Sequence, residues 1–396
     1  MKKSLAIIGS GPAALILAAQ LNEQLYDVHI YERNFAVARK FLVAGDGGFN
    51  LTHSEDPSQF VQRYTPSPFL HTAFSNFNNT ALRNWLKSIG IETYVGTSKR
   101  VFPVKGIKPI DVLNAILNVL KTKKVHIHTQ HCWKGWNEKN ELIFEYNEQT
   151  ILVNADVTVF ALGGASWNKT GSDGAWAPVF QSKGIQVNPF HASNCAYQVN
   201  WKTEFIQQHH GASLKNISIT CAGKSKLGEV VLTNFGMEGG AIYALSPQIR
   251  EQLLSKGSAE AFIDLKPSMS VDQILDRFSE RGNRSITKLL VDKLHLNEVH
   301  IALLKAQLSK EEFTNIPLLA EKIKTIPVIL QALAPMDEAI STVGGIDLSE
   351  LDESFQLKKM PSVYCIGEML DYDAPTGGYL LQSCFSMGNE VARLIS

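Results

Sequence analysis

Residues 5–33 carry the pattern that most restricts what this chain can fold into. Residues 5–8 are a short apolar run, as in a strand buried on both faces, and they lead directly into a G-x-G-x-x-A turn at residues 9–14. Helical periodicity follows over residues 12–24, with Pro12 suited to the first helical turn. Strand, glycine turn and helix therefore stand in the order of a dinucleotide-binding βαβ unit.

The residues of this unit match the needs of a nucleotide. Gly9 permits the tight turn, Gly11 lets the backbone approach a pyrophosphate, and Ala14 keeps the helix close to the strand. A second strand, residues 28–32, ends in Glu32, where an acidic side chain accepts the hydroxyls of an unphosphorylated ribose, and Arg33 follows. The pattern favours FAD or NAD over NADP, but it does not separate FAD from NAD.

The distribution of glycine along the chain favours FAD. A NAD-dependent dehydrogenase completes its nucleotide domain early in the chain, whereas here glycine-rich turns recur near positions 45, 163, 174, 345, 367 and 377. Two further apolar runs, residues 157–162 and 363–366, each lead into a glycine turn. We expect the strand near the C-terminus, residues 363–366, to return to the first domain and complete a flavin-binding site there.

Residues 40–52 form a glycine-rich segment that is too long for a simple hairpin. A loop this rich in glycine can pass close to a flat ring with its backbone amides exposed to that ring. The alternative is a mobile surface loop.

Six segments together resemble the YhiN/BaiN-like family of bacterial flavoproteins, within the superfamily that shares the glutathione-reductase-type FAD fold. The resemblance extends over nearly the whole chain, and its carriers are residues 9–14, 40–53, 100–103, 161–176, 233–246 and 367–388. The longest of them reads GEMLDYDAPTGGYLLQSCFSMG, which is highly specific.

The resemblance implies a place for FAD along these segments. The turn at residues 9–14 lines the pyrophosphate, Glu32 holds the adenosine ribose, and residues 40–52 border the ribityl chain and flavin. Glu368 stands where relatives hold ribityl and phosphate oxygens, and the amides after Gly377 face the flavin pyrimidine. The expected FAD-binding residues are Gly9, Ser10, Gly11, Pro12, Ala13, Ala14, Glu32, Arg33, Lys40, Gly45, Asp46, Gly47, Gly48, Asn50, Leu51, Thr52, Gly163, Gly164, Thr170, Asp173, Gly174, Gly367, Glu368, Gly377, Gly378, Tyr379 and Leu380.

The chain departs from the family pattern at three places. Residues 45–50 read GDGGFN where many relatives read GGGRCN, so the thiol that those relatives carry beside the flavin is absent. Residues 236–240 read GMEGG in place of G-x-x-G-P, and Trp167-Asn168 replaces a Tyr-Pro pair. We expect a substrate pocket that differs from that of the better-known branch.

The hydrophobic patterns divide the chain into three parts. Residues 1–190 and 335–396 are expected to form a Rossmann-like α/β FAD-binding domain, in which residues 125–132 and 142–146 pair as strands. Residues 191–260 alternate polar and apolar side chains, which predicts an inserted β-rich subdomain. Residues 261–334 have helical periodicity, which predicts a helical subdomain, and the whole insertion is expected to cap the substrate side.

The composition limits which binding partners and which cellular compartment we expect for this protein. The chain has 38 lysines and arginines and 38 aspartates and glutamates, so neither nucleic acid nor a membrane surface is expected as a partner. Five cysteines form no C-x-x-C pair, and the glycine turn interrupts the N-terminal apolar run before it resembles a signal peptide, so we expect a cytoplasmic protein. His209-His210 has no ligands at suitable spacing, so no metal is expected. The sequence does not indicate an oligomeric state.

These features predict an FAD-dependent oxidoreductase with a small-molecule substrate. The first hypothesis is an NAD(P)H-linked reductase of an enone-like compound, because some relatives reduce conjugated ketones in steroid-like molecules. NAD(P)H would bind transiently, since the insertion has no second G-x-G-x-x-G. The alternatives are a flavin oxidase acting on an amine or aminoketone, and a non-enzymatic protein with structural FAD. The catalytic residue is unassigned, because Asp371 and Asp373 can either supply a base or hold backbone turns.

Overall fold

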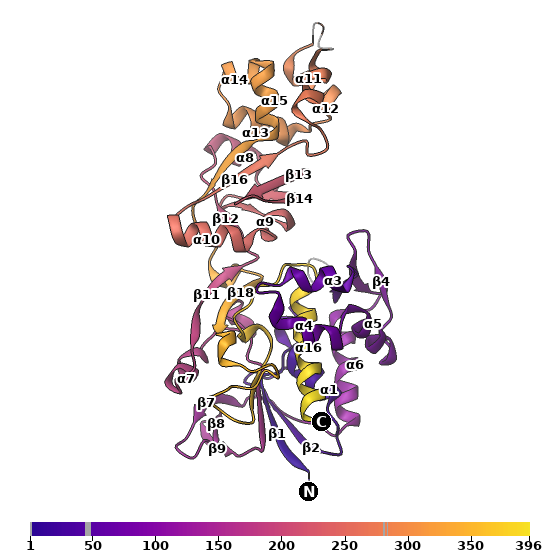
Figure 1. Cartoon of the computed structure of the whole chain (residues 1–396), viewed down its shortest axis with the longest axis vertical. Coiled ribbons are helices and arrows are strands. Elements are labelled where there is room, and N and C mark those ends of the chain that lie inside the picture. Colours follow the sequence, from indigo (N-terminus) through magenta and orange to yellow (C-terminus); the bar gives the residue numbers. More distant parts are fainter. Residues whose placement is uncertain (1, 44–48, 280–281, 283) are drawn as a thin grey trace. The chain divides into compact units, whose positions relative to one another are not determined.

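The computed structural model describes residues 2–43, 49–279, 282 and 284–396 (Figure 1). It divides into two compact units, Met1–His191 with Ile340–Ser396, and Ala192–Ala339. These boundaries lie within a few residues of those expected at residues 190 and 335. Among the described residues, no helix combines the length and the apolar character needed to cross a bilayer.

A five-stranded parallel sheet organises the first unit. Its strand order is β19-β10-β1-β2-β6, and each neighbouring pair is parallel. These strands are β1 (Lys3–Ile8), β2 (Tyr26–Tyr31), β6 (His126–His128), β10 (Val157–Phe160) and β19 (Val363–Cys365). The last four residues of β1 and all of β10 are buried, as expected for a parallel sheet that is covered on both faces. The predicted α/β, Rossmann-like fold is confirmed.

The remaining elements of the first unit surround this sheet. Its helices are α1 (Pro12–Gln20), α2 (Arg39–Val43), α3 (Pro57–Phe60), α4 (His71–Asn76), α5 (Asn79–Ser88), α6 (Pro109–Thr122), α7 (Ala177–Ser182) and α16 (Tyr379–Ile395). Two three-stranded antiparallel sheets are formed by β3 (Thr52–His53), β5 (Arg100–Pro103) and β4 (Thr93–Val95), and by β7 (Cys132–Trp136), β8 (Leu142–Tyr146) and β9 (Gln149–Val153). A two-stranded sheet pairs β11 (Val187–Ser193) with β18 (Ser341–Ile346).

Two sequence predictions about local elements need correction. Helix α1 ends at Gln20 rather than at residue 24. Residues 126–128 do not pair with β8: they form β6, which pairs in parallel with β2, whereas β8 pairs with β7. Gln130 has a positive φ of 59°, so the backbone turns between β6 and β7, and residues 125–132 belong to two strands rather than one.

Helix α16 packs against α1 at a point where only glycine fits. A Cβ on Gly388 would lie 2.4 Å from the backbone oxygen of Ala13 and 2.4 Å from Cγ2 of Ile16. We therefore expect Gly388→Ala to lower the free energy of unfolding by about 1–3 kcal/mol through overpacking, although alanine favours a helix. Urea unfolding measures this change. Leu394→Ala, at an exposed position of the same helix, is the control and should change little. A Gly388→Ala protein as stable as the wild type would contradict the close packing.

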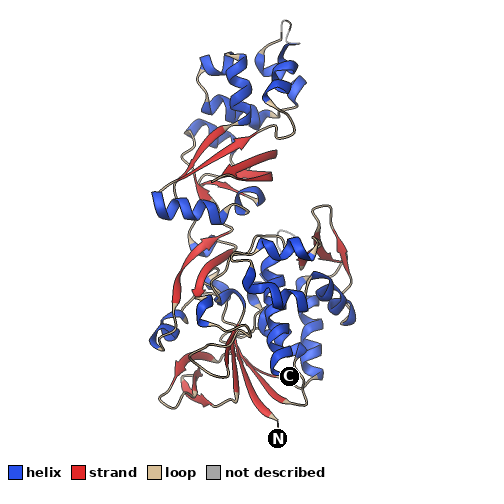
Figure 2. Ribbon diagram, viewed as in Figure 1, coloured by secondary structure: helices blue, strands red, loops and turns tan. Residues whose placement is uncertain are grey.

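The second unit contains a six-stranded antiparallel sheet (Figure 2). Its strand order is β12-β15-β14-β13-β16-β17, formed by β12 (Tyr197–Gln198), β13 (Ser213–Cys221), β14 (Lys224–Leu232), β15 (Gly236–Glu238), β16 (Ala259–Asp264) and β17 (Ile326–Leu330). Its helices are α8 (Thr203–His209), α9 (Gly240–Tyr243), α10 (Ser246–Lys256), α11 (Val271–Ser279), α12 (Ile286–Leu294), α13 (Glu298–Gln307), α14 (Lys310–Thr314) and α15 (Ile316–Lys324).

The insertion does not divide at residue 260 as the sequence patterns suggested. That boundary falls inside β16, and β17 lies in the segment expected to be helical. Helices α11–α15 connect these two strands, which pair with each other in the sheet. A single hydrophobic core includes side chains from the strands and from these helices, such as Ile263, Ile274 and Ile323. Shared burial therefore makes the two expected parts one folding unit.

Candidate cofactor site

The glycine turn between β1 and α1 is open toward a cavity. Gly9 has a φ of +98°, and a Cβ there would lie 2.4 Å from the backbone oxygen of Ala161, so only glycine fits. Gly11 is the N-cap of α1, and no side chain caps the helix. A Cβ on Gly11 would meet no atom within 4 Å. The amides at the start of α1 are thus accessible to an anion, and the helix dipole favours negative charge there.

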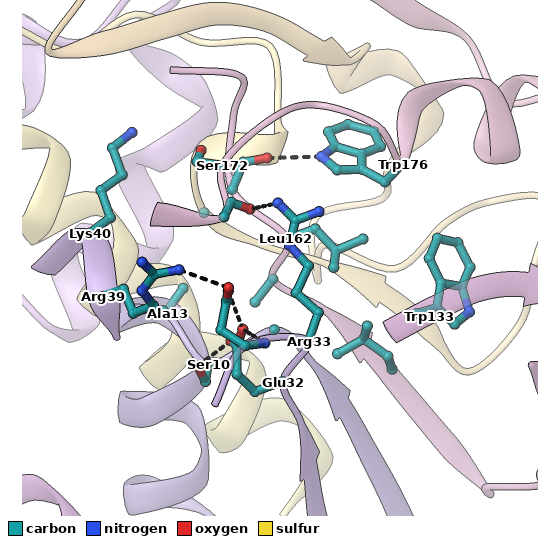
Figure 3. Close-up of a pocket in the computed structure, with 18 of the residues that line it drawn as sticks. Ser10, Ala13, Glu32, Arg33, Arg39, Lys40, Trp133, Leu162, Ser172 and Trp176 are labelled. Carbon is teal, nitrogen blue, oxygen red and sulfur yellow. Dashed lines mark hydrogen bonds between the residues drawn. The ribbon is translucent and has the colours of Figure 1, made fainter. Parts of the chain in front are cut away.

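Glu32 is held at the end of β2 by three donors. The Ser10 hydroxyl donates to Oε2, and the backbone amide and side-chain amide of Asn34 donate to Oε1 at 2.8 and 2.7 Å. The Glu32 side chain is nearly buried beside the glycine turn (Figure 3). A carboxylate oxygen can accept more than one hydrogen bond, so Glu32 retains capacity for a ribose hydroxyl.

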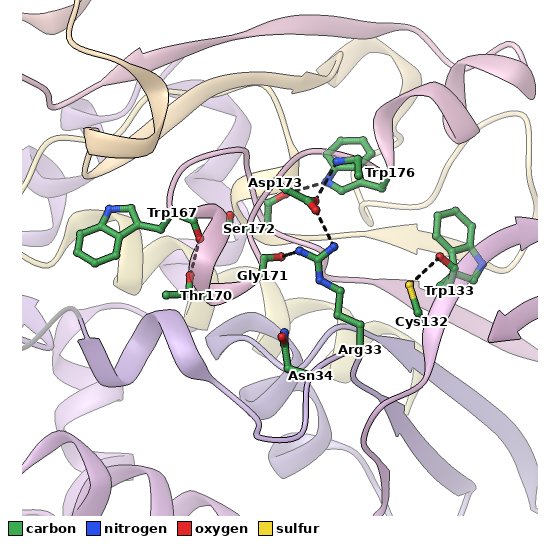
Figure 4. Close-up of polar contacts among 12 residues, drawn as sticks. Arg33, Asn34, Cys132, Trp133, Trp167, Thr170, Gly171, Ser172, Asp173 and Trp176 are labelled. Carbon is green, nitrogen blue, oxygen red and sulfur yellow. Dashed lines mark hydrogen bonds and ion pairs between the residues drawn. The ribbon is translucent and has the colours of Figure 1, made fainter. Parts of the chain in front are cut away.

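Arg33 connects the end of β2 to the loop after β10. Its Nη1 lies 2.8 Å from Oδ2 of Asp173, and its Nη2 donates to the backbone oxygen of Gly171 (Figure 4). On the other side, Nη1 of Arg39 donates to Oδ1 of Asn34 at 2.8 Å. These contacts fix the rim of the cavity around Glu32.

An ion pair lies at a different wall of the same cavity. Nζ of Lys40 is 2.7 Å from Oε2 of Glu368 and donates to the Ser166 hydroxyl at 2.9 Å. Oε1 of Glu368 accepts the backbone amide of Thr342 at 3.1 Å. The carboxylate of Glu368 is therefore both charge-paired and hydrogen-bonded, which compensates for its burial.

These groups line one cavity of about 350 Å³ within the first unit, a volume typical of a small-ligand site. The expected residues that line it are Gly9, Ser10, Gly11, Pro12, Ala13, Glu32, Arg33, Lys40, Gly163, Thr170, Asp173, Gly367 and Glu368. Segments far apart in sequence thus converge on a space that can hold part of a dinucleotide.

A family model described as HI0933-like protein Rossmann domain matches residues 3–394 of this chain. The chain belongs to the HI0933-like family. The family resemblance predicted from the sequence motifs is confirmed, and with it the class of enzyme: this HI0933-like chain is a flavoprotein oxidoreductase.

Two curated bacterial proteins are similar over almost their whole length. The chain is 23% identical to the "Ribosomal RNA dihydrouridine synthase" of Haemophilus influenzae, with 98% of each chain covered. It is 21% identical to the "3-dehydro-bile acid delta(4,6)-reductase" of Clostridium scindens, with 97% of each covered. A solved flavocytochrome c3 fumarate reductase has a similar fold, with a TM-score of 0.53 and 11% identity, covering 99% of this chain and 78% of that one.

Other expected residues of this HI0933-like chain lie outside the cavity. Ala14 is buried inside α1, and Gly164 and Gly174 pack against protein atoms. A second group joins the start of β3 and the residues before it to the start of α16. Its members are Asn50, Leu51, Thr52, Gly377, Gly378, Tyr379 and Leu380. A Cβ on Gly378 would lie 2.6 Å from Cα of Thr52, so the two segments are in direct contact. Gly45, Asp46, Gly47 and Gly48 lie outside the described residues.

Sequence reasoning missed one wall of the cavity. This wall comes from residues 131–134, at the start of β7, and from residues 172–179, which lead into α7. It consists of His131, Cys132, Trp133, Lys134, Ser172, Trp176 and Val179. Nε1 of Trp176 donates to the backbone oxygen of Gly163 at 3.0 Å, which holds the indole beside the glycine turn after β10. The aromatic residues of 133–136 were the available signal, but aromatic residues in strands more often indicate a core.

Two groups that could act chemically are constrained by their surroundings. Cys384 lines the cavity, and burial, followed by the charge of Glu368, raises the pKa of its thiol to about 12. The thiol stays protonated at neutral pH and is a poor nucleophile. Asp371 accepts from the Asn188 side-chain amide at 2.7 Å and from the Gly344 backbone amide at 2.9 Å. These bonds favour the structural interpretation of Asp371 over a catalytic one.

Proposed function

We propose that this chain is an FAD-dependent reductase of a carbon–carbon double bond conjugated to a carbonyl group, with NAD(P)H as electron donor. The observation that carries the FAD part of the proposal is the convergence of an uncapped helix N-terminus and a fixed carboxylate on one cavity. The start of α1 suits a pyrophosphate, and Glu32 suits the hydroxyls of a ribose. A bound FAD would supply hydride chemistry.

In this proposal the protein residues bind and orient the cofactor. The backbone at Gly9–Gly11 would contact the pyrophosphate, and Lys40 with Glu368 would lie beside the ribityl chain. The contact between residues 50–52 and residues 377–380 would form the flavin side of the site, because α16 begins there and its N-terminus stabilises negative charge.

The names of the two relatives support the proposed type of substrate bond, a carbon–carbon double bond conjugated to a carbonyl group. The bile acid enzyme is named for the reduction of double bonds conjugated to a ring ketone. Dihydrouridine differs from uridine by reduction of the double bond conjugated to a carbonyl of the uracil ring. The shared chemistry is reduction of an enone-like group, and we assign that chemistry to this chain.

We favour a small molecule as the substrate. Basic and acidic residues are equal in number over the whole chain, so the chain has no net positive charge that would attract a polyanion. A uridine of ribosomal RNA is the second candidate, because two relatives with that name match almost the whole chain.

The first experiment reduces the purified protein under anaerobic conditions and records its absorbance spectrum throughout. We expect bound FAD that is bleached by NADH or NADPH and is reoxidised by a steroid enone under anaerobic conditions. Reoxidation only by a ribosomal RNA transcript would replace the small-molecule assignment with the second candidate. Bleaching by an amine donor, with peroxide formed in air, would contradict the reductase proposal in favour of an oxidase. A protein that cannot be reconstituted with FAD would contradict the proposal altogether.

A further inference from the structure

A cluster of histidines lies at the edge of the parallel sheet in the first unit. Asp27 and His29 are two positions apart on β2 and therefore project from the same face of the strand. His126 is the register partner of His29 on the edge strand β6. Parallel pairing thus places two imidazoles and one carboxylate side by side.

The distances between the possible ligand atoms of these three side chains leave room for a metal ion between them. Nε2 of His29 lies 3.3 Å from Oδ2 of Asp27, and Nε2 of His126 lies 3.6 Å from Oδ1. Hydrogen bonds between such atoms are usually shorter than about 3.2 Å. Two ligands that bind a tetrahedral ion at about 2.0–2.1 Å lie roughly 3.3–3.4 Å apart. One ligand atom from each of the three residues lies within 4.8 Å of the others.

We propose that Asp27, His29 and His126 form a binding site for a divalent transition-metal ion, with Zn²⁺ as the preferred occupant. Two imidazole nitrogens and one carboxylate oxygen are typical ligands of Zn²⁺, whereas Mg²⁺ and Ca²⁺ prefer oxygen ligands alone. Three protein ligands leave the fourth tetrahedral position for water. Within the part of the chain that the structure describes, no other group of histidine, cysteine and acidic side chains meets the same geometric condition.

A third histidine, His128, supports the orientation of His29. Nδ1 of His29 is hydrogen-bonded to Nε2 of His128 at 2.9 Å, which leaves Nε2 of His29 directed toward Asp27. Metal-binding histidines commonly use their second nitrogen in this way. The His29 ring also stacks on His126, with centroids 4.8 Å apart, and on His128 at 5.2 Å. These contacts hold the three side chains together, and a rotation of the His126 ring turns its Nε2 lone pair, which lies in the ring plane, toward an ion shared with His29.

The test is titration of the full-length, FAD-containing protein with Zn²⁺ after treatment with a chelator. We expect isothermal titration calorimetry to show one Zn²⁺ per chain and Co²⁺ to give the visible absorption of a tetrahedral site. His126→Ala and Asp27→Ala should each weaken Zn²⁺ binding by more than roughly tenfold, and His128→Phe by about tenfold. His71→Ala, which removes an exposed histidine elsewhere in the first unit, is the matched control and should bind as the wild type does.

Two further readouts separate ligand loss from damage to the fold. Zn²⁺ should raise the melting temperature of the wild type and of His71→Ala, but not that of His126→Ala, because only a bound ion stabilises the folded state. The metal-free variants should melt as the metal-free wild type does, since Asp27 and His126 are exposed. A wild type that takes up no Zn²⁺, or a His126→Ala protein that binds it as tightly as the wild type, would overturn the assignment.

Discussion

Gly11→Ala is expected to weaken FAD binding roughly 100-fold while leaving the apoprotein as stable as the wild type, a loss of about 2.7 kcal/mol in binding free energy. The backbone of Gly11 has a φ of −71°, which alanine adopts without strain, and the new Cβ would meet no protein atom within 4 Å. Because Gly11 lines the cavity, the added methyl group would stand where the pyrophosphate must approach the backbone. Quenching of flavin fluorescence on addition of FAD to apoprotein measures the affinity.

Gly9→Ala provides the matched comparison. Its Cβ would lie 2.4 Å from the backbone oxygen of Ala161, and φ is +98°, so this variant should lose stability whether or not FAD is present. Gly11→Ala should differ by melting normally as an apoprotein. If Gly11→Ala binds FAD as tightly as the wild type, the pyrophosphate does not lie against this turn.

The parts of the fold that depend on neighbouring residues could be predicted from the sequence. The strand, glycine turn, helix and acidic residue of the first unit follow from side-chain periodicity and from small residues at fixed spacing. Glu32 does lie directly after β2, beside Ser10. The apolar runs at residues 157–162 and 363–366 likewise contain the strands β10 and β19.

The parts that depend on distant pairing could not be predicted in this way. His126 lies opposite His29 only because β6 pairs in parallel with β2, and no local pattern specifies that pairing. Similarly, β16 and β17 are neighbours although α11–α15 lie between them in sequence. Burial of shared hydrophobic surface decides such contacts, and single-sequence periodicity does not contain that information.

The residues of the candidate site could also be predicted only in part, because the sequence does not show which of them lie together. The family resemblance assigned Lys40 and Glu368 separately to the region of the ribityl chain, and the structure joins them in an ion pair of 2.7 Å. Trp133 and Trp176 line the cavity because their strand and loop pack beside β10, which only the folded chain reveals. The cofactor assignment of each residue remains a prediction that substitutions can test.

Substitution of Glu32 is expected to have the second large effect on FAD affinity. We expect Glu32→Gln to weaken FAD binding roughly tenfold and Glu32→Ala roughly 100-fold, because hydrogen bonds to a charged carboxylate are worth about 1.5–3 kcal/mol. Glutamine keeps an oxygen that can accept from a ribose hydroxyl but loses the charge. Alanine removes both, and it also leaves Ser10 and Asn34 without their acceptor. FAD titration of the apoproteins measures both changes.

The control for Glu32 is Glu92→Gln, which neutralises an exposed glutamate of the same unit and should leave FAD affinity unchanged. A graded loss from glutamine to alanine, with normal melting of the Glu32→Gln apoprotein, would mean that the carboxylate acts on the ligand rather than only on its own loop. If both Glu32 variants bind FAD as the wild type does, the ribose lies elsewhere. Because Gly11 and Glu32 contribute to the same cavity, wild-type FAD affinity in Gly11→Ala as well would exclude this cavity as the FAD site.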